Sequence, residues 1–264
     1  MYHNPNSTKS EKIKIVWELK GGGYIMLEKE RVTINNQGEM KNNINFLITK
    51  LEESLEKDEI LLSETELIEL SYHRDRYIRN RCCLAFLLMP QVVAKNNLLR
   101  LLNDRSPLVR MEAGECLSDF FDDEDVCSAL LDAFLKEKHQ VTRGVLVSSL
   151  LSVGYKKTNI IEIVEKAIQT EHCYFVKVSC YRCFHLLCNR DTLQQIINCF
   201  SSKKYQTRCA VVNALDEILD EENAKTIFHA LEHFSDIEKE SYAVQDTINH
   251  LKTKIKSMYD FSID

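Results

Sequence analysis

The chain has 264 residues, of which 44% are hydrophobic and 28% charged, and its formal net charge is −6. This balance supplies ample apolar material for a buried core and excludes a disordered chain. The negative net charge argues against nucleic acid as a partner, because phosphate binding rests on clustered positive charge. No apolar run approaches the roughly 20 residues that a membrane-spanning helix needs, so we expect no membrane partner.

Glycine and proline are scarce, with seven and three residues respectively. A β-sandwich or a Rossmann sheet needs many more turn residues, so this composition predicts helices. The ten cysteines would suit disulfides or metal binding. Because the N-terminus lacks the apolar core of a signal peptide, we instead expect reduced thiols and a cytoplasmic location.

Residues 1–25 differ in character from the rest of the chain. Three glycines follow Lys20, and Met26 comes shortly after them. In codons, Lys-Gly-Gly is what a purine-rich bacterial ribosome-binding site would encode. One hypothesis is therefore that a bacterial gene is translated from Met26 and that residues 1–25 are an upstream leader. The alternative is a flexible glycine-rich tail after a small N-terminal strand.

A short pattern recurs along the remainder of the chain. A basic residue follows an apolar or Thr residue, a small apolar residue comes three positions later, and a large apolar residue comes four positions after that. Successive basic residues are 31, 33, 34 and 31 positions apart, and they are Arg79, Arg110, Arg143, Lys177 and Arg208. A weaker sixth copy surrounds Ala243 and Thr247.

The apolar positions within each copy have the spacing i, i+4, i+8, which is one face of a helix. A second apolar-periodic segment lies between successive copies. Each unit is therefore predicted to be a pair of antiparallel helices, A and then B. Start signals agree with this prediction: Ser106 and Pro107 suit a helix cap followed by a first helical residue, and the acidic run 122–125 suits the start of the next A helix.

The segment from Asn103 to Ala113 resembles the HEAT-repeat family, because an acidic turn residue is followed by Val-Arg and a small residue on helix B. The resemblance spans roughly residues 60–255. It implies an all-α fold, a right-handed, armadillo-like α-solenoid of about six antiparallel helix pairs, and it is uninformative about activity. We expect a leader or tail at 1–25, a capping segment with a helix at 26–58, and the solenoid at 59–264.

The cluster of His172, Cys173, Cys180, Cys183, His185 and Cys188 has metal-ligand residue types. Most of these residues lie on one helix, where His185 points roughly 140° away from Cys180, so one tetrahedral ion would not gather them. In the repeat register, Cys180 aligns with Cys82 and Ala113. We therefore interpret these thiols as small buried residues, and we expect no metal and no cofactor.

The recurring basic residues Arg79, Arg110, Arg143, Lys177 and Arg208 allow two interpretations. They would either line a phosphate-binding groove or form a structural ladder in which each side chain bonds an acidic or carbonyl partner in the adjoining turn. Asp104 and Glu137, six residues before Arg110 and Arg143, favour the ladder.

No catalytic constellation is present. HEAT-type hydroxylases hold iron through His-Glu pairs, and this sequence has no His-Glu dipeptide. HEAT-like DNA glycosylases use aromatic residues in a basic groove, and the single tryptophan, Trp17, lies before the repeats. Phycobilin lyases share the repeat type, without diagnostic residues here. We therefore expect no catalytic residues, and we keep a HEAT-like DNA glycosylase or other nucleic-acid-processing enzyme as the alternative.

The leading hypothesis is a non-catalytic scaffold or adaptor that binds another protein with the concave face of the B helices. An immunity or antitoxin protein that masks a basic partner would be one example. Arg and Tyr are favoured at binding hot spots, and mixed charge suits a specific protein. The predicted contacts lie on B helices or in the turns before them, and they are Arg74, Arg76, Arg81, Glu112, Glu115, Tyr181 and Arg182.

Overall fold

The computed structural model divides the chain into two compact units, Met1–Lys50 and Leu51–Asp264. Side chains are described from Ile44 onward, outside residues 155, 189, 236–240 and 260–264. The backbone is described for residues 10–20, 23–34, 39–154, 156–188, 190–237 and 241–259.

The first unit contains an antiparallel hairpin. Strand β1 (Ser10–Lys20) pairs with strand β2 (Gly23–Ile34), with a register shift between Val16 and Trp17. Helix α1 (Glu39–Lys57) begins in this unit and includes the helix expected in the capping segment. The hairpin is an addition to the expected all-α fold. Translation from Met26, which lies in β2, stays a prediction.

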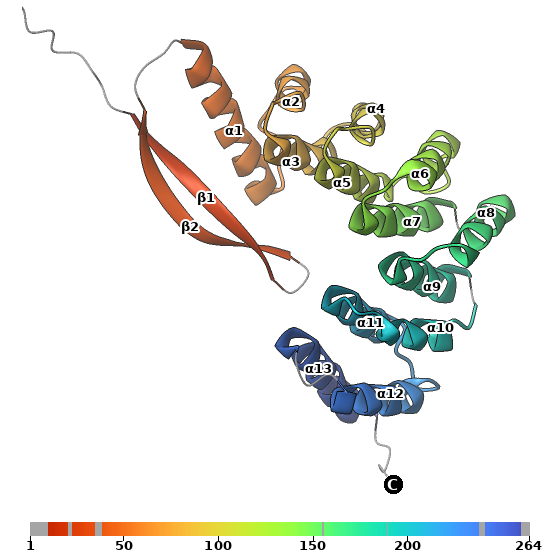
Figure 1. Ribbon diagram of the computed structural model, residues 1–264. Helices are drawn as coiled ribbons and strands as arrows, with labels where there is room; N and C mark the ends of the chain where they lie inside the picture. The colour runs from red at the N-terminus through yellow and green to blue at the C-terminus, as the bar shows by residue number, and fades with distance from the viewer. Residues whose placement is uncertain are drawn as a thin grey trace, which may run out of the picture. The chain divides into compact units, whose positions relative to one another are not determined.

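The second unit is the expected all-α solenoid, with six helix pairs following one another along an arc (Figure 1). The A helices form its outer layer, and they are α2 (Glu64–Leu70), α4 (Gln91–Leu101), α6 (Glu124–Lys136), α8 (Thr158–Gln169), α10 (Leu193–Asn198) and α12 (Ala224–Ile237). The B helices form its inner layer, and they are α3 (Arg76–Phe86), α5 (Pro107–Leu117), α7 (Gln140–Gly154), α9 (Tyr174–Cys188), α11 (Tyr205–Glu217) and α13 (Tyr242–Met258). A short 3₁₀ turn, η1 (Cys199–Ser201), continues α10.

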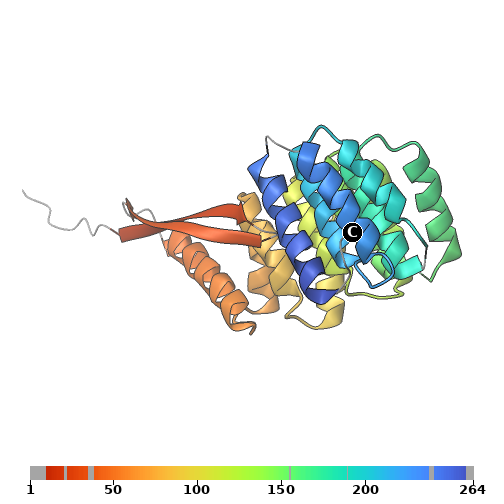
Figure 2. The same ribbon diagram turned by 90° about the horizontal axis from the view of Figure 1, so that it is seen from below.

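Each B helix packs on the B helix of the next pair, from α3 on α5 through to α11 on α13. The last helices lie side by side in the view from below (Figure 2). Stacking of this kind buries the faces that a single pair leaves open. None of the described helices is both long and apolar enough to cross a membrane.

The core follows the register predicted from the sequence. The position three residues after each recurring basic residue is fully buried, and its occupants are Cys82, Ala113, Leu146, Cys180 and Val211. The large apolar residue four positions further on is also buried, and its occupants are Phe86, Leu117, Leu150, Phe184 and Leu215. Both apolar positions of the repeat therefore face the interior.

The two predicted start signals have different outcomes. Asp123 caps α6 as expected, since its carboxylate accepts a hydrogen bond from the Val126 amide at 3.1 Å. Ser106 precedes Pro107, but its hydroxyl makes no capping bond and is buried without a hydrogen-bond partner. The prediction of a capping hydroxyl there was wrong. In this turn the hydrogen bond is made by the Ser106 amide, which donates to the carboxylate of Asp104 at 2.7 Å.

Candidate functional site

The recurring arginines join each helix pair to the next. Arg79 donates through Nε and Nη2 to the two carboxylate oxygens of Asp104, at 2.7 and 2.8 Å. Arg110 makes the same two-pronged contact with Glu137, at 2.7 and 2.9 Å. Arg143 pairs with Glu171 at 3.1 Å. Each acid lies in the A–B turn of the following pair, so these contacts cross from one repeat to the next.

The arginines also bond within their own repeat, through a backbone carbonyl six residues earlier. Arg79 Nη1 donates to the His73 carbonyl, Arg110 Nη1 to the Asp104 carbonyl and Arg208 Nη1 to the Ser202 carbonyl, each at 2.8 Å. Asp104 therefore offers its carbonyl to Arg110 and its carboxylate to Arg79. The expected ladder allowed an acidic or a carbonyl partner for Arg110 in the adjoining turn, and within its own repeat that partner is the carbonyl of Asp104.

The fourth basic residue, Lys177, lies apart from this scheme, with its ammonium 5.9 Å from the ring centre of Tyr174. A lysine carries a single compact charge and lacks the planar fork that a carboxylate and a carbonyl both engage. The arginines of the first three repeats have their guanidinium groups directed at carboxylates. That arrangement favours the ladder over a phosphate-binding groove.

The acids of the ladder stay ionised for a clear reason. Burial alone would raise the pKa of Asp104 and of Glu137, since a charge is poorly solvated there. The hydrogen bonds from Arg79 and from the Ser106 amide outweigh burial at Asp104, and those from Arg110 and the His139 amide outweigh it at Glu137. Both pKa values are therefore lowered.

The inner surface of the arc is formed by a partly exposed row of residues on each B helix, which we call the inner stripe. Its members are counted from the recurring basic residue of each B helix. One lies two residues before that basic residue, and the others lie two, five and nine residues after it. On the three central B helices its members are Leu108, Glu112 and Glu115 on α5, Val141, Val145 and Ser148 on α7, and Phe175, Ser179, Arg182 and Leu186 on α9.

Hydrogen bonds between neighbouring helices hold the inner stripe in place. Arg81 pairs with Glu52 of α1 at 3.1 Å, and the Asn80 amide donates to Glu112 at 2.9 Å. Arg182 donates to both carboxylate oxygens of Glu217 on α11, at 2.9 and 3.0 Å, and to Ser148 of α7 at 3.4 Å. Glu112, Ser148 and Arg182 of the inner stripe are therefore held by contacts within the chain itself.

The predicted contact residues divide into three groups. Arg81, Glu112, Glu115 and Arg182 belong to the inner stripe or its α3 counterpart, and Glu115 is exposed. Arg74 and Arg76 are exposed but lie at the A–B turn before α3, at one edge of the solenoid. The side chain of Tyr181 packs against the hydrophobic core of the last pairs, and burial raises its pKa.

An apolar area on the inner stripe had no counterpart among the predicted contacts. Val141 is 44% exposed near the start of α7, and Val145 and Phe175 are partly exposed stripe members of α7 and α9. Leu186, 48% exposed, lies near the end of α9, beyond Ser179 and Arg182. Glu112 and Glu115 lie on the neighbouring helix α5. The repeat register was sufficient to find these residues, because each occupies a position of the inner stripe: Val145 matches Arg81, Val141 and Phe175 match Leu108, and Leu186 lies nine residues after Lys177.

Cys180 and Cys183 are buried at the positions where the repeat register predicted small core residues, whereas Cys173 and Cys188 are only partly buried. All ten cysteines are free thiols, and Cys180 and Cys183 are both in α9. Burial raises the pKa of Cys82 and of Cys199 to about 12, because a thiolate is poorly solvated there. Within the described part of the chain, no group of three or more His, Cys, Asp or Glu side chains is arranged to hold a metal ion.

Comparison with known families agrees with this architecture. A family model of HEAT repeats matches residues 64–151, which comprise the first three helix pairs. The resemblance predicted from Asn103–Ala113 is thus confirmed over that range. No curated protein is significantly similar to the chain in sequence.

Proposed function

Because residues 64–151 are HEAT repeats, we propose that this chain is a non-catalytic scaffold that binds another protein on the inner stripe. HEAT repeats commonly serve as protein-interaction scaffolds, and a stack of this kind presents a long preformed surface. The observation that carries the proposal is the exposed apolar area of α7 and α9, with charged side chains beside it.

The composition of this area suits a protein partner. Interface centres are apolar and poor in charge, while their rims are polar. Val141, Val145 and Phe175 supply such a centre, and Glu115 of α5 and Arg182 of α9 supply charges of both signs beside it. A phosphate backbone would need clustered positive charge instead, which the inner stripe lacks.

The inner stripe is also pre-organised. Arg182 is held between Ser148 and Glu217, so the guanidinium group loses little freedom when a partner binds. Ordering side chains costs roughly 0.5–1.5 kcal/mol each on association, and a surface ordered beforehand avoids much of that cost. This favours specific binding of one partner.

The test is affinity capture from the native host with a tagged chain carrying Val141→Asp and Leu186→Lys. Val141 is near the start of α7 and Leu186 near the end of α9, so both new charges complement the helix dipoles and the net charge is unchanged. We expect the wild-type chain to retain one stoichiometric protein and the double variant to lose it, with an unchanged melting temperature.

The matched control carries Val92→Asp and Leu135→Lys. These residues are 72% and 50% exposed, lie near the start of α4 and the end of α6, and belong to outer-layer helices. The control should retain the partner. Equal retention by both variants would reject the inner stripe, and recovery of nucleic acid with the wild-type chain would favour a nucleic-acid-processing function.

A further inference from the structure

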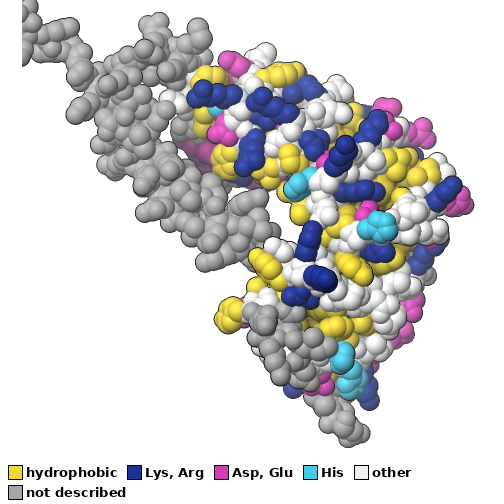
Figure 3. All heavy atoms as spheres, in the orientation of Figure 1, with side chains coloured by type: hydrophobic (Ala, Val, Ile, Leu, Met, Phe, Trp, Pro, Cys, Tyr) yellow, Lys and Arg dark blue, Asp and Glu magenta, His cyan; other side chains and the backbone are white. Residues whose placement is uncertain are grey.

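One edge of the solenoid carries a basic residue in each of its first five A–B turns. The residue five positions before the recurring basic residue is Arg74, Arg105, Lys138, His172 and Lys203 in successive pairs, and all five are exposed. We call these residues the edge row. The sixth A–B turn falls outside the described residues. Figure 3 shows Lys and Arg side chains distributed along the arc on the face in view.

The four lysine and arginine charges of the edge row are not neutralised by neighbouring acids. Throughout the described part of the chain, no carboxylate forms an ion pair with Arg74, Arg105, Lys138 or Lys203. Asp104, Glu137 and Glu171, in the second to fourth turns, each pair with a ladder arginine. Asp75, in the first turn, accepts the capping hydrogen bond from the Tyr77 amide. The three paired acids balance the charge of the ladder arginines, so the lysines and arginines of the edge row give this edge a net positive charge.

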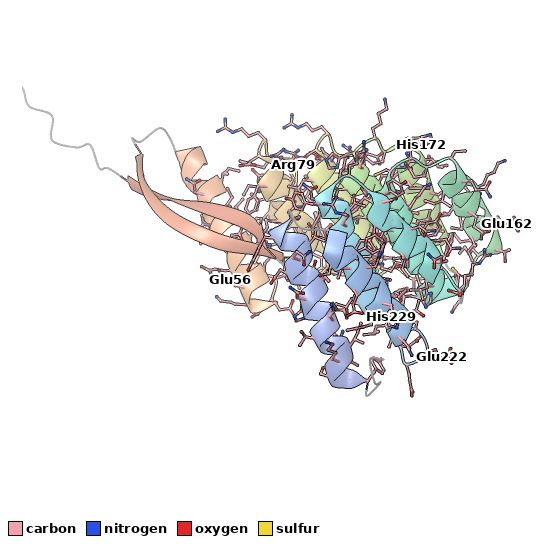
Figure 4. All side chains as sticks on the ribbon, turned by 60° about the horizontal axis from the view of Figure 1, so that its bottom comes forward. Glu56, Arg79, Glu162, His172, Glu222 and His229 are labelled. Atoms are coloured by element: carbon pink, nitrogen blue, oxygen red, sulfur yellow. The ribbon has the colours of Figure 1, made fainter. Side chains whose placement is uncertain are left out.

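The opposite edge differs in sign. Two of its B–A turns carry dense acidic runs, Asp119–Asp125 and Asp216–Glu222. Lys156, Lys157 and Arg190 lie in two other turns of that edge. Figure 4 shows Arg79 and His172 toward one edge and Glu222 toward the other. The chain's net charge of −6 therefore does not describe the edge row, whose lysines and arginines lie on the edge opposite these acidic runs.

The spacing of the edge row indicates what kind of anion it fits. Neighbouring packed helices are roughly 8–10 Å apart, so the first three turns place about one positive charge every 10 Å, from Arg74 to Lys138. His172 occupies the fourth turn, and Lys203 carries the next lysine or arginine charge in the fifth. An extended peptide advances about 3.3 Å per residue, so one acidic residue in three would meet each charge. Duplex DNA carries about one charge per 1.7 Å, a much higher density than this row would neutralise.

We propose that the edge row binds an extended acidic segment of a protein, with acidic side chains at about every third residue. This rests on the proposed function, since the segment is taken to belong to the protein that occupies the inner stripe. Exposed tyrosines at the first positions of α9 and α11, Tyr174 and Tyr205, lie two residues after His172 and Lys203 and supply contact area beside the charges.

The experiment measures fluorescence anisotropy with a labelled peptide made of about five Asp-Gly-Ser units, at low salt. A second peptide has the same composition, with all its aspartates consecutive, and a third probe is a thymidine oligonucleotide of similar length. The wild-type chain should bind the spaced peptide saturably and more tightly than the clustered one. Added salt should weaken that binding, because exposed charges are screened.

The edge variant replaces four residues with serine, at Arg74, Arg105, Lys138 and Lys203. We expect it to bind the spaced peptide about tenfold more weakly or worse, since four exposed charge pairs, each weak by itself, are lost together. The control variant removes the same number of charges, at Lys156, Lys166, Lys225 and Lys256, which lie outside the edge row. It should keep wild-type affinity.

Several results would overturn the proposal. They are equal losses in the edge and control variants, equal affinity for the spaced and clustered peptides, absence of saturable binding, and tighter binding of the oligonucleotide through the same four residues. The inner-stripe variant Val141→Asp with Leu186→Lys should bind the peptide normally. Failure at the edge is thereby distinguished from failure of the proposed scaffold function.

Discussion

Two arginines on one turn of α3 have different surroundings. The side chains of Arg79 and Asp104 are only 5% and 10% exposed, whereas those of Arg81 and Glu52 are 23% and 24% exposed. Removing one member of a buried pair leaves an uncompensated charge, while an exposed pair contributes little. The two ion pairs differ mainly in how deeply they are buried, while both arginines lie on the same turn of α3. Substituting each arginine therefore measures how burial changes the contribution of an ion pair to stability.

We expect Arg79→Met to lower the free energy of unfolding by about 3–5 kcal/mol, because the Asp104 carboxylate is then left without its guanidinium partner. Arg81→Met should lower it by about 1 kcal/mol or less. Urea denaturation monitored by circular dichroism measures both. Similar losses in the two variants would mean that Arg79 contributes packing rather than charge pairing.

The ladder acids also predict how stability depends on pH. The pKa values of Asp104 and Glu137 are lower in the folded chain, so their stabilisation is present above the ordinary carboxyl range. It is lost as the pH falls through those lowered values. The difference in unfolding free energy between about pH 7 and about pH 4 should shrink in the variant Asp104→Asn with Glu137→Gln, although this variant is less stable at neutral pH.

Glu112 provides a control of opposite sign. Burial raises its pKa, and the hydrogen bond from Asn80 only partly offsets that. Its ionised form therefore costs stability at neutral pH, and this cost is relieved as the pH falls through the raised value. Glu112→Gln should stabilise the chain at about pH 7, and its unfolding free energy should fall more steeply with acid than that of the wild type.

At the scale of helices, the packing of α7 on α9 depends on a glycine. A Cβ atom on Gly144 would lie 2.7 Å from two ring carbons of Phe175 and 3.0 Å from the Ser179 hydroxyl. Such a close approach lets the two B helices meet beneath the apolar area of the inner stripe. A side chain there would push Phe175 away from its place.

We expect Gly144→Val to destabilise the chain by about 1–3 kcal/mol through overpacking. Helix propensity alone predicts the reverse, since glycine is the poorer helix former. Phe175→Ala in the same chain should recover part of the loss, so a double-mutant cycle in urea should show favourable coupling. Additive effects would mean that the ring does not meet the new side chain.

The repeat register predicted the helix pairs and their buried positions, because a spacing of 31–34 residues and the i, i+4, i+8 pattern are local properties. Ion pairs were harder to predict. Asp104 is 25 residues from Arg79 and six from Arg110, and its carboxylate bonds Arg79. Which arginine the Asp104 carboxylate bonds depends on how consecutive helix pairs stack, and distance along the sequence does not predict that stacking. The apolar residues of α7 and α9 had not been predicted as contacts, because every predicted contact except Tyr181 is a charged residue.

At the scale of the whole molecule, net charge does not describe how charge is distributed over the solenoid. The chain's sum of −6 conceals the surplus of positive charge at the A–B turns and the acidic runs at the B–A turns. A solenoid has two long edges with separate sequences, so each edge has its own electrostatics. Charge in such a fold is informative only when it is counted turn by turn.

Each helix pair packs mainly on the pairs next to it, so a destabilising substitution should open mainly the pairs that adjoin it. The buried cysteines report on this because they are spread along the stack: Cys82 is in the first pair, Cys116 in the second, Cys127 in the third and Cys180 in the fourth. In the wild-type chain, the half-buried Cys173, Cys188 and Cys209 should react first with a thiol reagent. The raised pKa values of the buried thiols slow them further.

We expect Gly144→Val, at the junction of the third and fourth pairs, to accelerate labelling of Cys127 and Cys180 far more than that of Cys82. Labelling under native conditions, followed site by site with mass spectrometry, measures the three rates. The reason is that opening of the α7–α9 junction exposes the adjoining pairs while α3 stays packed on α5. Equal acceleration at all three cysteines would show instead that the six pairs open as one cooperative unit. In that case, adding Phe175→Ala to the Gly144→Val chain should slow the labelling of all three cysteines together.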